Sequence, residues 1–119
     1  MKTYRESLEA GRLSFQRCRH CTHAWLPPRE ECPRCLRADW AWEEAGGAAK
    51  LVSWVVYHTA YDPAWAGRVP YNVAIVELAE GPRLISNILA PNDSLRGDMA
   101  LRLVVEREGD RAVPRFAPG

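Results

Sequence analysis

The stretch Cys18-Arg19-His20-Cys21, followed after ten residues by Cys32-Pro33-Arg34-Cys35, decides the fold of the N-terminal part of this chain. A Cys-x-x-Cys turn, or knuckle, directs two thiolates at one point, and two knuckles supply the four sulfur ligands of a tetrahedral zinc ion. Four protein ligands leave no open position for water, so we expect one structural zinc per chain rather than a catalytic metal. The spacing therefore predicts a rubredoxin-like zinc ribbon with Cys18, Cys21, Cys32 and Cys35 as ligands.

Other states of the four cysteines are compatible with the sequence: two disulfides, a redox-active dithiol, an iron site of rubredoxin type, or unrelated core thiols. Residues 1–11 are polar and charged and carry no apolar run of the kind that begins a signal peptide, so we expect a cytoplasmic protein with reduced thiols. A reducing compartment favours a zinc site over disulfide bonds for these four cysteines. His20 and His23 lie near the knuckles, but four cysteines complete the shell and we leave both histidines outside it.

Composition narrows the class of partner. The 119 residues, 47% of them hydrophobic, suit one globular domain or two very small modules, and no run approaches the length of a membrane span. The formal charge is +1, and a zinc ion with four thiolates adds two negative charges, which brings the folded protein near −1. Because this balance gives no general attraction for phosphate backbones, we expect neither a nucleic-acid nor a membrane partner.

The N-terminal segment reads as a short helix over residues 3–10, with Gly11 at its exit. Tyr4 and Leu8 share one face of this helix. A helix of eight residues is not stable alone, so it must dock either on its own ribbon or on another chain. Residues 44–49 then lose all large side chains, which indicates a linker and a module boundary.

The second half of the chain has the pattern of a strand meander. Residues 51–59, 71–79, 84–89 and 101–106 are rich in β-branched and aromatic residues, and 80–83 form a turn. The apolar parity changes near Ile75 and Val76, which indicates a β-bulge. Four or five strands in about 60 residues fit a compact OB-fold barrel. The expected fold is mostly β, with a helix at 1–12, the ribbon at 13–45, the OB-fold domain at 46–112 and an extended tail at 113–119.

Two segments carry candidate contact residues. Residues 60–69 contain Tyr61, Trp65 and Arg68, and this loop has more aromatic surface than a plain connection needs. Its aromatic side chains either cap an open end of the barrel or contact a partner. Phe116 lies in a tail with two prolines and requires a pocket, on its own barrel or on a partner. We name Trp65, Arg68 and Phe116 as candidate contacts with a partner or substrate.

Several short blocks occur in an order that resembles a known family, the zinc-ribbon plus OB-fold proteins associated with acyl-CoA conversion. The blocks are Gly11-Arg12-Leu13, Gln16-Arg17-Cys18, Pro27-Pro28-Arg29, Cys32-Pro33-Arg34-Cys35, Val69-Pro70-Tyr71, Glu80-Gly81-Pro82-Arg83-Leu84 and Pro114-Arg115-Phe116. The resemblance spans essentially the whole chain. One departure is that a glycine often follows each knuckle in the family, whereas Thr22 and Leu36 stand there in this chain. Those positions favour glycine where the turn needs a positive φ.

The resemblance implies a small accessory subunit that forms a hetero-oligomer with a thiolase-like enzyme (thiolase, aldolase or HMG-CoA synthase type) and supports acyl-CoA conversion. The residues agree, because thiolase chemistry needs an activated cysteine and all four cysteines are assigned to the metal. The sequence has no G-x-S-x-G elbow and no P-loop, and His58 has no evident acidic partner. We expect no catalysis by this chain alone.

Two other functions are compatible with the sequence. A stand-alone acyl-CoA carrier would bind CoA thioesters without an enzyme partner, although a domain of this size offers little enclosing surface. An OB-fold protein for single-stranded nucleic acid would use stacking aromatics and a basic groove, and five tryptophans and fourteen arginines are present. The near balance of acids and bases opposes the second of these functions.

Overall fold

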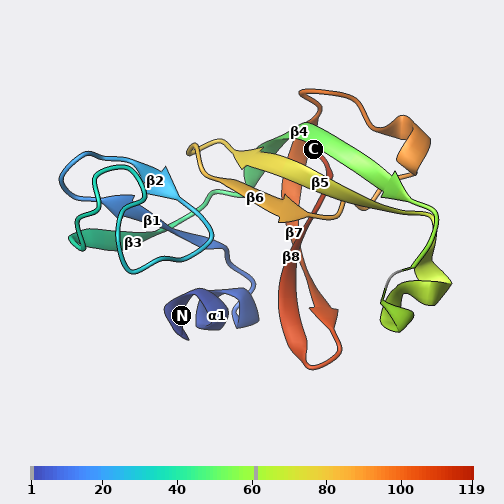
Figure 1. The fold of residues 1–119 in the computed structure, drawn as a ribbon, viewed down its shortest axis with the longest axis horizontal. Helices are drawn as coiled ribbons and strands as arrows, with labels where there is room; N and C mark the ends of the chain where they lie inside the picture. The colour runs from blue at the N-terminus through green and yellow to red at the C-terminus, as the bar shows by residue number, and fades with distance from the viewer. Residues whose placement is uncertain (1, 61) are drawn as a thin grey trace.

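The computed structural model describes residues 2–60 and 62–119, so Tyr61 of the candidate contact loop lies outside the described residues. The molecule is elongated, with extents of 44 × 31 × 24 Å, and its two β-rich parts lie toward opposite ends (Figure 1). The ribbon part is a three-stranded antiparallel sheet in the order β2-β1-β3. Its strands are β1 (Ser14–Cys18), β2 (Ala24–Trp25) and β3 (Trp40–Glu44). The mostly β fold predicted from the sequence is confirmed.

The second part is a five-stranded antiparallel sheet in the order β6-β5-β4-β7-β8. Its strands are β4 (Ala48–Tyr57), β5 (Tyr71–Leu78), β6 (Arg83–Ser86), β7 (Ala100–Glu108) and β8 (Arg111–Pro118). Short 3₁₀ helices, η1 (Pro63–Arg68) and η2 (Asn92–Ser94), fill two of the connections. The sheet curls until the segment after β6 meets β8 in parallel, where the Leu89 N–H donates to the Phe116 carbonyl at 2.7 Å. This closure is that of an OB-fold barrel.

The β-bulge lies one strand away from its predicted place. In β5 the buried and less buried side chains alternate without interruption. The register between β4 and β5 shifts between Leu51 and Ser53, so the extra residue is Val52 of β4, opposite Ile75 and Val76. The parity change that suggested a bulge in β5 arises because the apolar side chains of Tyr71, Val73 and Ile75 lie on the less buried face of the strand. The bulge bends the long strand β4 around the barrel.

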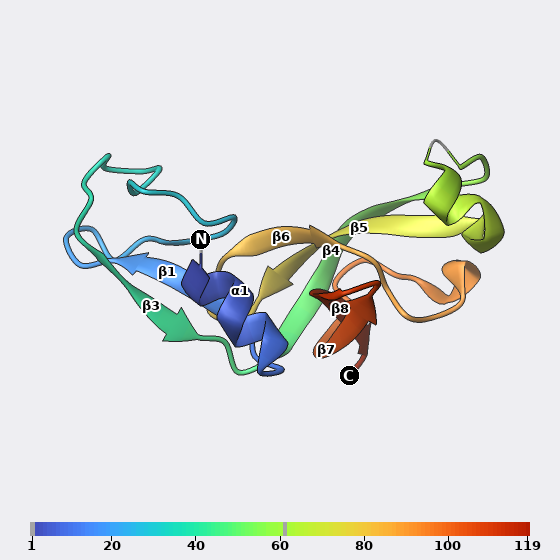
Figure 2. The same cartoon turned by 90° about the horizontal axis from the view of Figure 1, so that it is seen from below.

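Helix α1 (Lys2–Glu9) packs against both the ribbon and the barrel (Figure 2). Its end is a Schellman motif, because Gly11 has a φ of +83° and the Arg12 N–H donates to the Ser7 carbonyl at 2.8 Å. Leu8 is buried in the main core and Tyr4 packs against that core, as their shared face predicts. The helix contacts β1 and β8, so it docks on its own chain. Among the helices of the described residues, none has the length and apolar character needed to cross a membrane.

The main hydrophobic core runs without a gap from the ribbon into the barrel. Leu13, just before β1, and Phe15 of β1 are fully buried in the same cluster as Leu51 and Val76 of the barrel. The linker is also held to the barrel by a hydrogen bond, because the Gly46 N–H donates to Glu80 Oε2 at 2.7 Å. The linker predicted from the sequence is therefore packed between the two parts.

The C-terminal residues form a strand. The predicted tail at 113–119 belongs mostly to β8, which pairs with β7 over its whole length, from Leu101 opposite Pro118 to Glu108 opposite Arg111. Its two prolines are tolerated because β8 is the outer strand in the order of the sheet. Phe116 is fully buried in the main core. Its side chain packs on its own barrel, which is one of the two alternatives left open by the sequence.

Candidate metal centre

The four cysteines come from two turns with the same backbone design. Cys18 ends β1, and Cys32 lies in the long loop between β2 and β3. Each begins a turn closed by a backbone hydrogen bond, from Thr22 N–H to the Cys18 carbonyl at 3.1 Å and from Leu36 N–H to the Cys32 carbonyl at 2.8 Å. Thr22 and Leu36 have φ values of 65° and 67°. Both turns thus use the positive φ for which glycine is favoured at these two positions.

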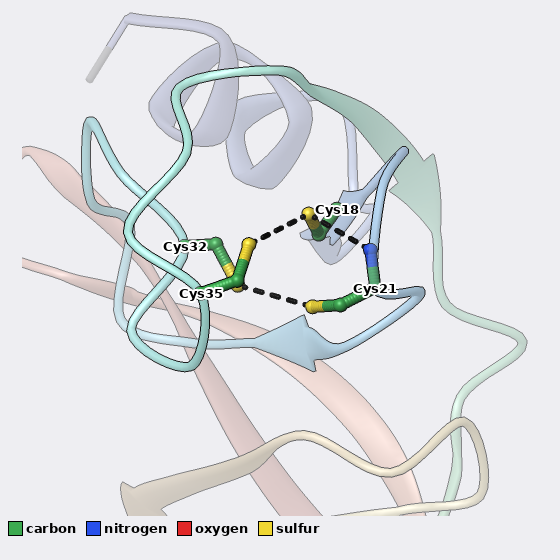
Figure 3. A group of neighbouring side chains, drawn as sticks. All are labelled: Cys18, Cys21, Cys32 and Cys35. Atoms are coloured by element: carbon green, nitrogen blue, oxygen red, sulfur yellow. Dashed lines mark hydrogen bonds between the residues drawn. The ribbon is translucent and has the colours of Figure 1, made fainter.

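The sulfur atoms converge on one point (Figure 3). All four lie within 4.8 Å of one another, with Cys18 Sγ to Cys35 Sγ at 3.5 Å and Cys21 Sγ to Cys32 Sγ at 3.6 Å. A tetrahedral zinc ion with Zn–S bonds of about 2.3 Å separates its sulfurs by about 3.8 Å. The distances fit such an ion and are far longer than the bond of about 2.05 Å in a disulfide. The geometry excludes unrelated core thiols and favours one closed four-sulfur site.

The surroundings of the thiols already favour proton loss at part of the site. Backbone N–H groups of Cys21 and His20 point at Cys18 Sγ and lower its pKa to about 7, although burial opposes this. At Cys35, a backbone hydrogen bond from Arg37 lowers the pKa, but burial and the three neighbouring thiols raise it to about 11. A bound zinc ion holds all four sulfurs as thiolates.

The histidines and arginines around the site have other partners. His20 Nδ1 lies 2.9 Å from the Arg37 guanidinium, and the ring of His23 stacks on Trp25 at 6.2 Å. Neither histidine belongs to the group of converging ligand atoms, which consists of the four cysteines named from the sequence. Arg17 and Arg19 form ion pairs with acidic residues of the ribbon at 3.1 Å, so part of the positive charge near the zinc is already balanced.

A second cluster lies at the far end of the barrel, around Trp65 of η1. The Trp65 ring packs against Tyr71 with the centroids 4.7 Å apart, and the Arg68 guanidinium lies 4.6 Å from the indole centroid. Arg68 and Arg115 both pair with Glu108, at 2.7 and 2.8 Å. The hydrogen bond from Arg68 holds the pKa of Glu108 below its usual range. Trp65 and Arg68 border a cavity of about 650 Å³.

Two residues of this cluster, Arg115 and Glu108, were not predicted from the sequence. Arg115 has only 11% of its side chain exposed and Glu108 pairs with it across β7 and β8, but nothing in their local sequence indicates the contact. The Pro114-Arg115-Phe116 block was the only available signal. Phe116 itself is not part of the surface here, because it is fully buried in the core. In this structure its side chain is not available for direct contact with a partner, whereas Trp65 and Arg68 lie at the surface of the same end of the barrel.

Comparison with known families matches both parts of the chain. A family model described as the rubredoxin-like zinc ribbon domain of ChsH2 matches residues 5–41. A second model, the C-terminal OB-fold domain of ChsH2, matches residues 42–106. The two matches agree with the zinc ribbon and the barrel seen in the structure. Strand β8 lies beyond the second match but completes the same barrel.

Individual relatives cover nearly the whole chain. A probable enoyl-CoA hydratase alpha subunit of Thermomonospora curvata is 36% identical over 95% of this chain, which spans only 35% of that protein. A DUF35 domain-containing scaffold protein of Methanocaldococcus jannaschii is 31% identical, over 95% of this chain and 83% of the relative. The solved structure of the Ltp2-ChsH2(DUF35) aldolase contains a chain that is 34% identical with a TM-score of 0.86, covering 98% of this chain and 92% of that one. This chain belongs to the ChsH2 family of proteins, which join a rubredoxin-like zinc ribbon to a C-terminal OB fold.

Proposed function

We propose that this chain is a non-catalytic subunit that assembles with a thiolase-like enzyme and supports the conversion of an acyl-CoA substrate. The observation that carries the proposal is the likeness to the chain of the Ltp2-ChsH2(DUF35) aldolase, which extends over 98% of the sequence. The name of the Methanocaldococcus jannaschii relative, a scaffold protein, supports the same role. Assembly then takes place through the surface of the chain, and the zinc ion stabilises the ribbon without taking part in catalysis.

The side chains support a role without chemistry. All four cysteines converge within 4.8 Å, so none is free to act as a nucleophile. His58, which follows β4, is exposed to solvent. A closed zinc shell offers no open coordination position to a substrate. The catalytic residues of the complex belong to the partner in this proposal.

We also propose that this chain contacts the acyl-CoA substrate directly. The phosphates of CoA suit guanidinium groups, and Arg68 lies beside the Trp65 ring at the rim of the 650 Å³ cavity. Both residues lie at the surface near the tip of the β4–β5 hairpin, where a partner can enclose them. Trp65 and Arg68 are therefore the proposed contacts with the partner or with the nucleotide end of the substrate.

The first experiment is affinity purification of the tagged full-length chain from its own cells, followed by size exclusion and mass spectrometry. A thiolase-like enzyme in stoichiometric amount supports the proposal and identifies the reaction to assay. Recovery of the chain alone, or with nucleic acid, contradicts it. Recovery of an enoyl-CoA hydratase, as the name of the Thermomonospora curvata relative suggests, changes the class of partner.

The substrate contact has its own test in the purified complex. Trp65→Ala should weaken association or lower turnover, because it removes the ring on which Arg68 and Tyr71 pack. Arg102→Gln, which alters an exposed arginine of β7, serves as the control. An unchanged complex and an unchanged rate for Trp65→Ala would remove Trp65 from the site. Calorimetry of the isolated chain with a CoA thioester tests the stand-alone carrier, for which binding without the enzyme is required.

A further inference from the structure

The outer face of the barrel sheet carries a cluster of exposed apolar side chains. Four large apolar side chains on three adjacent strands are exposed, Val55 by 53%, Tyr57 by 36%, Ile75 by 39% and Ile85 by 73%. The register places Ile75 directly opposite Ile85, so these two side chains lie on one face of adjacent strands. A contiguous exposed apolar patch on a folded domain is typical of an interaction surface.

The apolar face continues into a groove beside helix α1, which we call the helix-side groove. It has a volume of about 590 Å³ and is lined mainly by Tyr4, Leu26, Pro27, Ile75, Ile85 and Pro114. These residues come from the helix, the ribbon and three strands of the barrel, so the groove exists only because the two parts are packed together. Its charged lining residue, Arg83, is already paired with Glu77 at 2.9 Å. The groove offers an apolar floor without a free charge in it.

Two smaller hollows share lining residues with the groove. One, of about 450 Å³, shares Ile85 and Pro114 with it and reaches Trp65. The other, of about 360 Å³, shares Tyr4 and Pro114 and is bordered by Arg5 and Arg111. The three hollows therefore neighbour one another between the Trp65 end of the barrel and the N-terminal helix. Together they offer a row of open hollows, which suits a segment of protein better than a small molecule, because a small molecule requires an enclosed cavity.

The charges at the helix end restrict the chemistry of the occupant. Arg5 and Arg111 are exposed, and neither forms an ion pair within the described residues, since the nearby Glu9 is paired with Arg107. Arg5 does lower the pKa of Glu9, but only as the smallest contribution, after the hydrogen bond from Arg107 and others. The two guanidinium groups are thus available to acidic residues on a partner.

The concave shape of the helix-side groove favours a different protein over a second copy of this chain as its occupant. In a two-fold dimer built on this face, the same patch of both copies would meet, and a groove would face a groove. A concave surface is complementary to a ridge, such as a helix or an extended segment that projects from another surface. Ion pairing with Arg5 and Arg111 also requires acidic residues, which do not line this part of the groove.

The geometry points to the helix-side groove as the docking surface for the thiolase-like partner enzyme, which inserts an apolar segment flanked by acidic residues. This inference rests on the proposed function, because it takes the enzyme partner from it. The apolar floor around Ile75 and Ile85 supplies the binding energy, and Arg5 and Arg111 orient the segment. The zinc ribbon contributes one wall of the groove through Leu26 and Pro27.

The test uses the full chain with its bound zinc and the thiolase-like enzyme identified by the purification described above, with affinity measured by interferometry. Ile85→Gln should weaken binding by about tenfold or more, because it places a polar amide where the partner presents apolar surface. Leu36→Gln is the matched control, since Leu36 is 70% exposed against 73% for Ile85 but lies on the ribbon outside the groove. Zinc content and thermal unfolding should stay unchanged in both variants.

The charged end is tested by a second pair of variants. The double variant Arg5→Gln/Arg111→Gln should lower the association rate constant at low salt by about threefold or more and reduce its dependence on salt. Arg102→Gln, an exposed arginine of β7 away from the groove, should leave the rate unchanged. Equal rates for all three proteins would contradict the orienting role of Arg5 and Arg111.

The binding experiment distinguishes a wrong docking surface from a wrong enzyme partner. If the unaltered chain binds the enzyme and Ile85→Gln binds it equally well, the groove is not the docking surface and the proposed function stands. If the unaltered chain binds no thiolase-like enzyme, the proposed function fails and the inference fails with it. If the isolated chain is a dimer that Ile85→Gln converts to a monomer, the occupant is a second copy and the inference is overturned.

Discussion

The knuckle end of the ribbon and the barrel are stabilised by different means. Around the cysteines the buried cluster consists of Cys18, Trp25 and Cys32, with a few half-buried neighbours. Among the described residues, thirteen are buried in the main core, which includes residues of β1 and the helix as well as the barrel. Apolar burial can therefore hold the barrel, whereas residues 18–40 need the metal ion. One chain therefore contains a metal-dependent region attached to a metal-independent one.

Loss of a zinc ligand should have the largest effect and should be confined to the knuckle end. Cys32→Ser removes a fully buried sulfur from the site, and structural zinc contributes about 10 to 16 kcal/mol in zinc-finger peptides. We expect loss of stoichiometric zinc and rapid amide exchange over residues 18–40, with slow exchange kept in β4, β5 and β7. Elemental analysis and hydrogen exchange with mass spectrometry provide the measurements.

The control for this variant is His20→Ala, which alters a knuckle residue outside the predicted shell and should keep one zinc per chain. Full zinc retention by Cys32→Ser would contradict a four-cysteine site. Elemental analysis of the unaltered protein also separates zinc from the iron alternative. Loss of slow exchange in the barrel as well would show that the two regions are not independent.

Truncation of the buried aromatic residue of β8 should have the next largest effect. Phe116→Ala leaves a cavity in the main core and should lower the free energy of unfolding by about 3 to 5 kcal/mol. Because the core continues into β1, we expect protection of the Phe15 amide to fall together with that of the barrel. Urea unfolding followed by circular dichroism, combined with hydrogen exchange, measures both effects.

The matched control is Val113→Ala on the same strand, where the side chain is half-buried and the loss should be about 1 kcal/mol. An equally small loss for Phe116→Ala, with weaker binding of the enzyme, would return Phe116 to the list of partner contacts.

The connection between the two regions depends in part on one carboxylate. Glu80→Ala removes the acceptor of the Gly46 N–H and should lower the free energy of unfolding by about 1 kcal/mol. The Gly46 amide should exchange faster, which hydrogen exchange measured by NMR can resolve. Glu80→Gln keeps an acceptor oxygen and should behave almost like the unaltered chain. Equal exchange at Gly46 in all three proteins would mean that the core alone fixes the linker.

The ribbon and the family could be predicted from the sequence because their signals are local. The spacing of the knuckles, Gly11 after the helix and the positive φ at Thr22 and Leu36 depend on a few adjacent residues. The barrel strands β4 to β7 were also predicted from their composition, whereas β8 was not. The proposed domain boundary between residues 45 and 46 stays a prediction, since the structure joins the two parts through one core.

The remaining features depend on contacts between distant residues. The bulge lies in β4 because of how β4 pairs with β5, and the pattern of a single strand does not show which partner carries the extra residue. The prolines of β8 suggested a tail, and only the position of β8 at the edge of the sheet order makes them compatible with a strand. The pairing of Arg115 with Glu108 depends on the same β7–β8 register.

The smallest expected effect concerns the turn of the second knuckle. Leu36 adopts a φ of +67°, a conformation that costs about 1 to 2 kcal/mol in residues with a Cβ. Leu36→Gly removes this cost but gains chain entropy in the unfolded state, so we expect a net stabilisation of about 0.5 kcal/mol. Leu36→Ala keeps the Cβ and should give no gain, and little packing is lost in either variant because Leu36 is 70% exposed. Zinc release to a competing chelator measures the difference, because the turn contributes to the metal-dependent region alone. Equal release from the Gly and Ala variants would mean that backbone strain at Leu36 does not limit the stability of the zinc site.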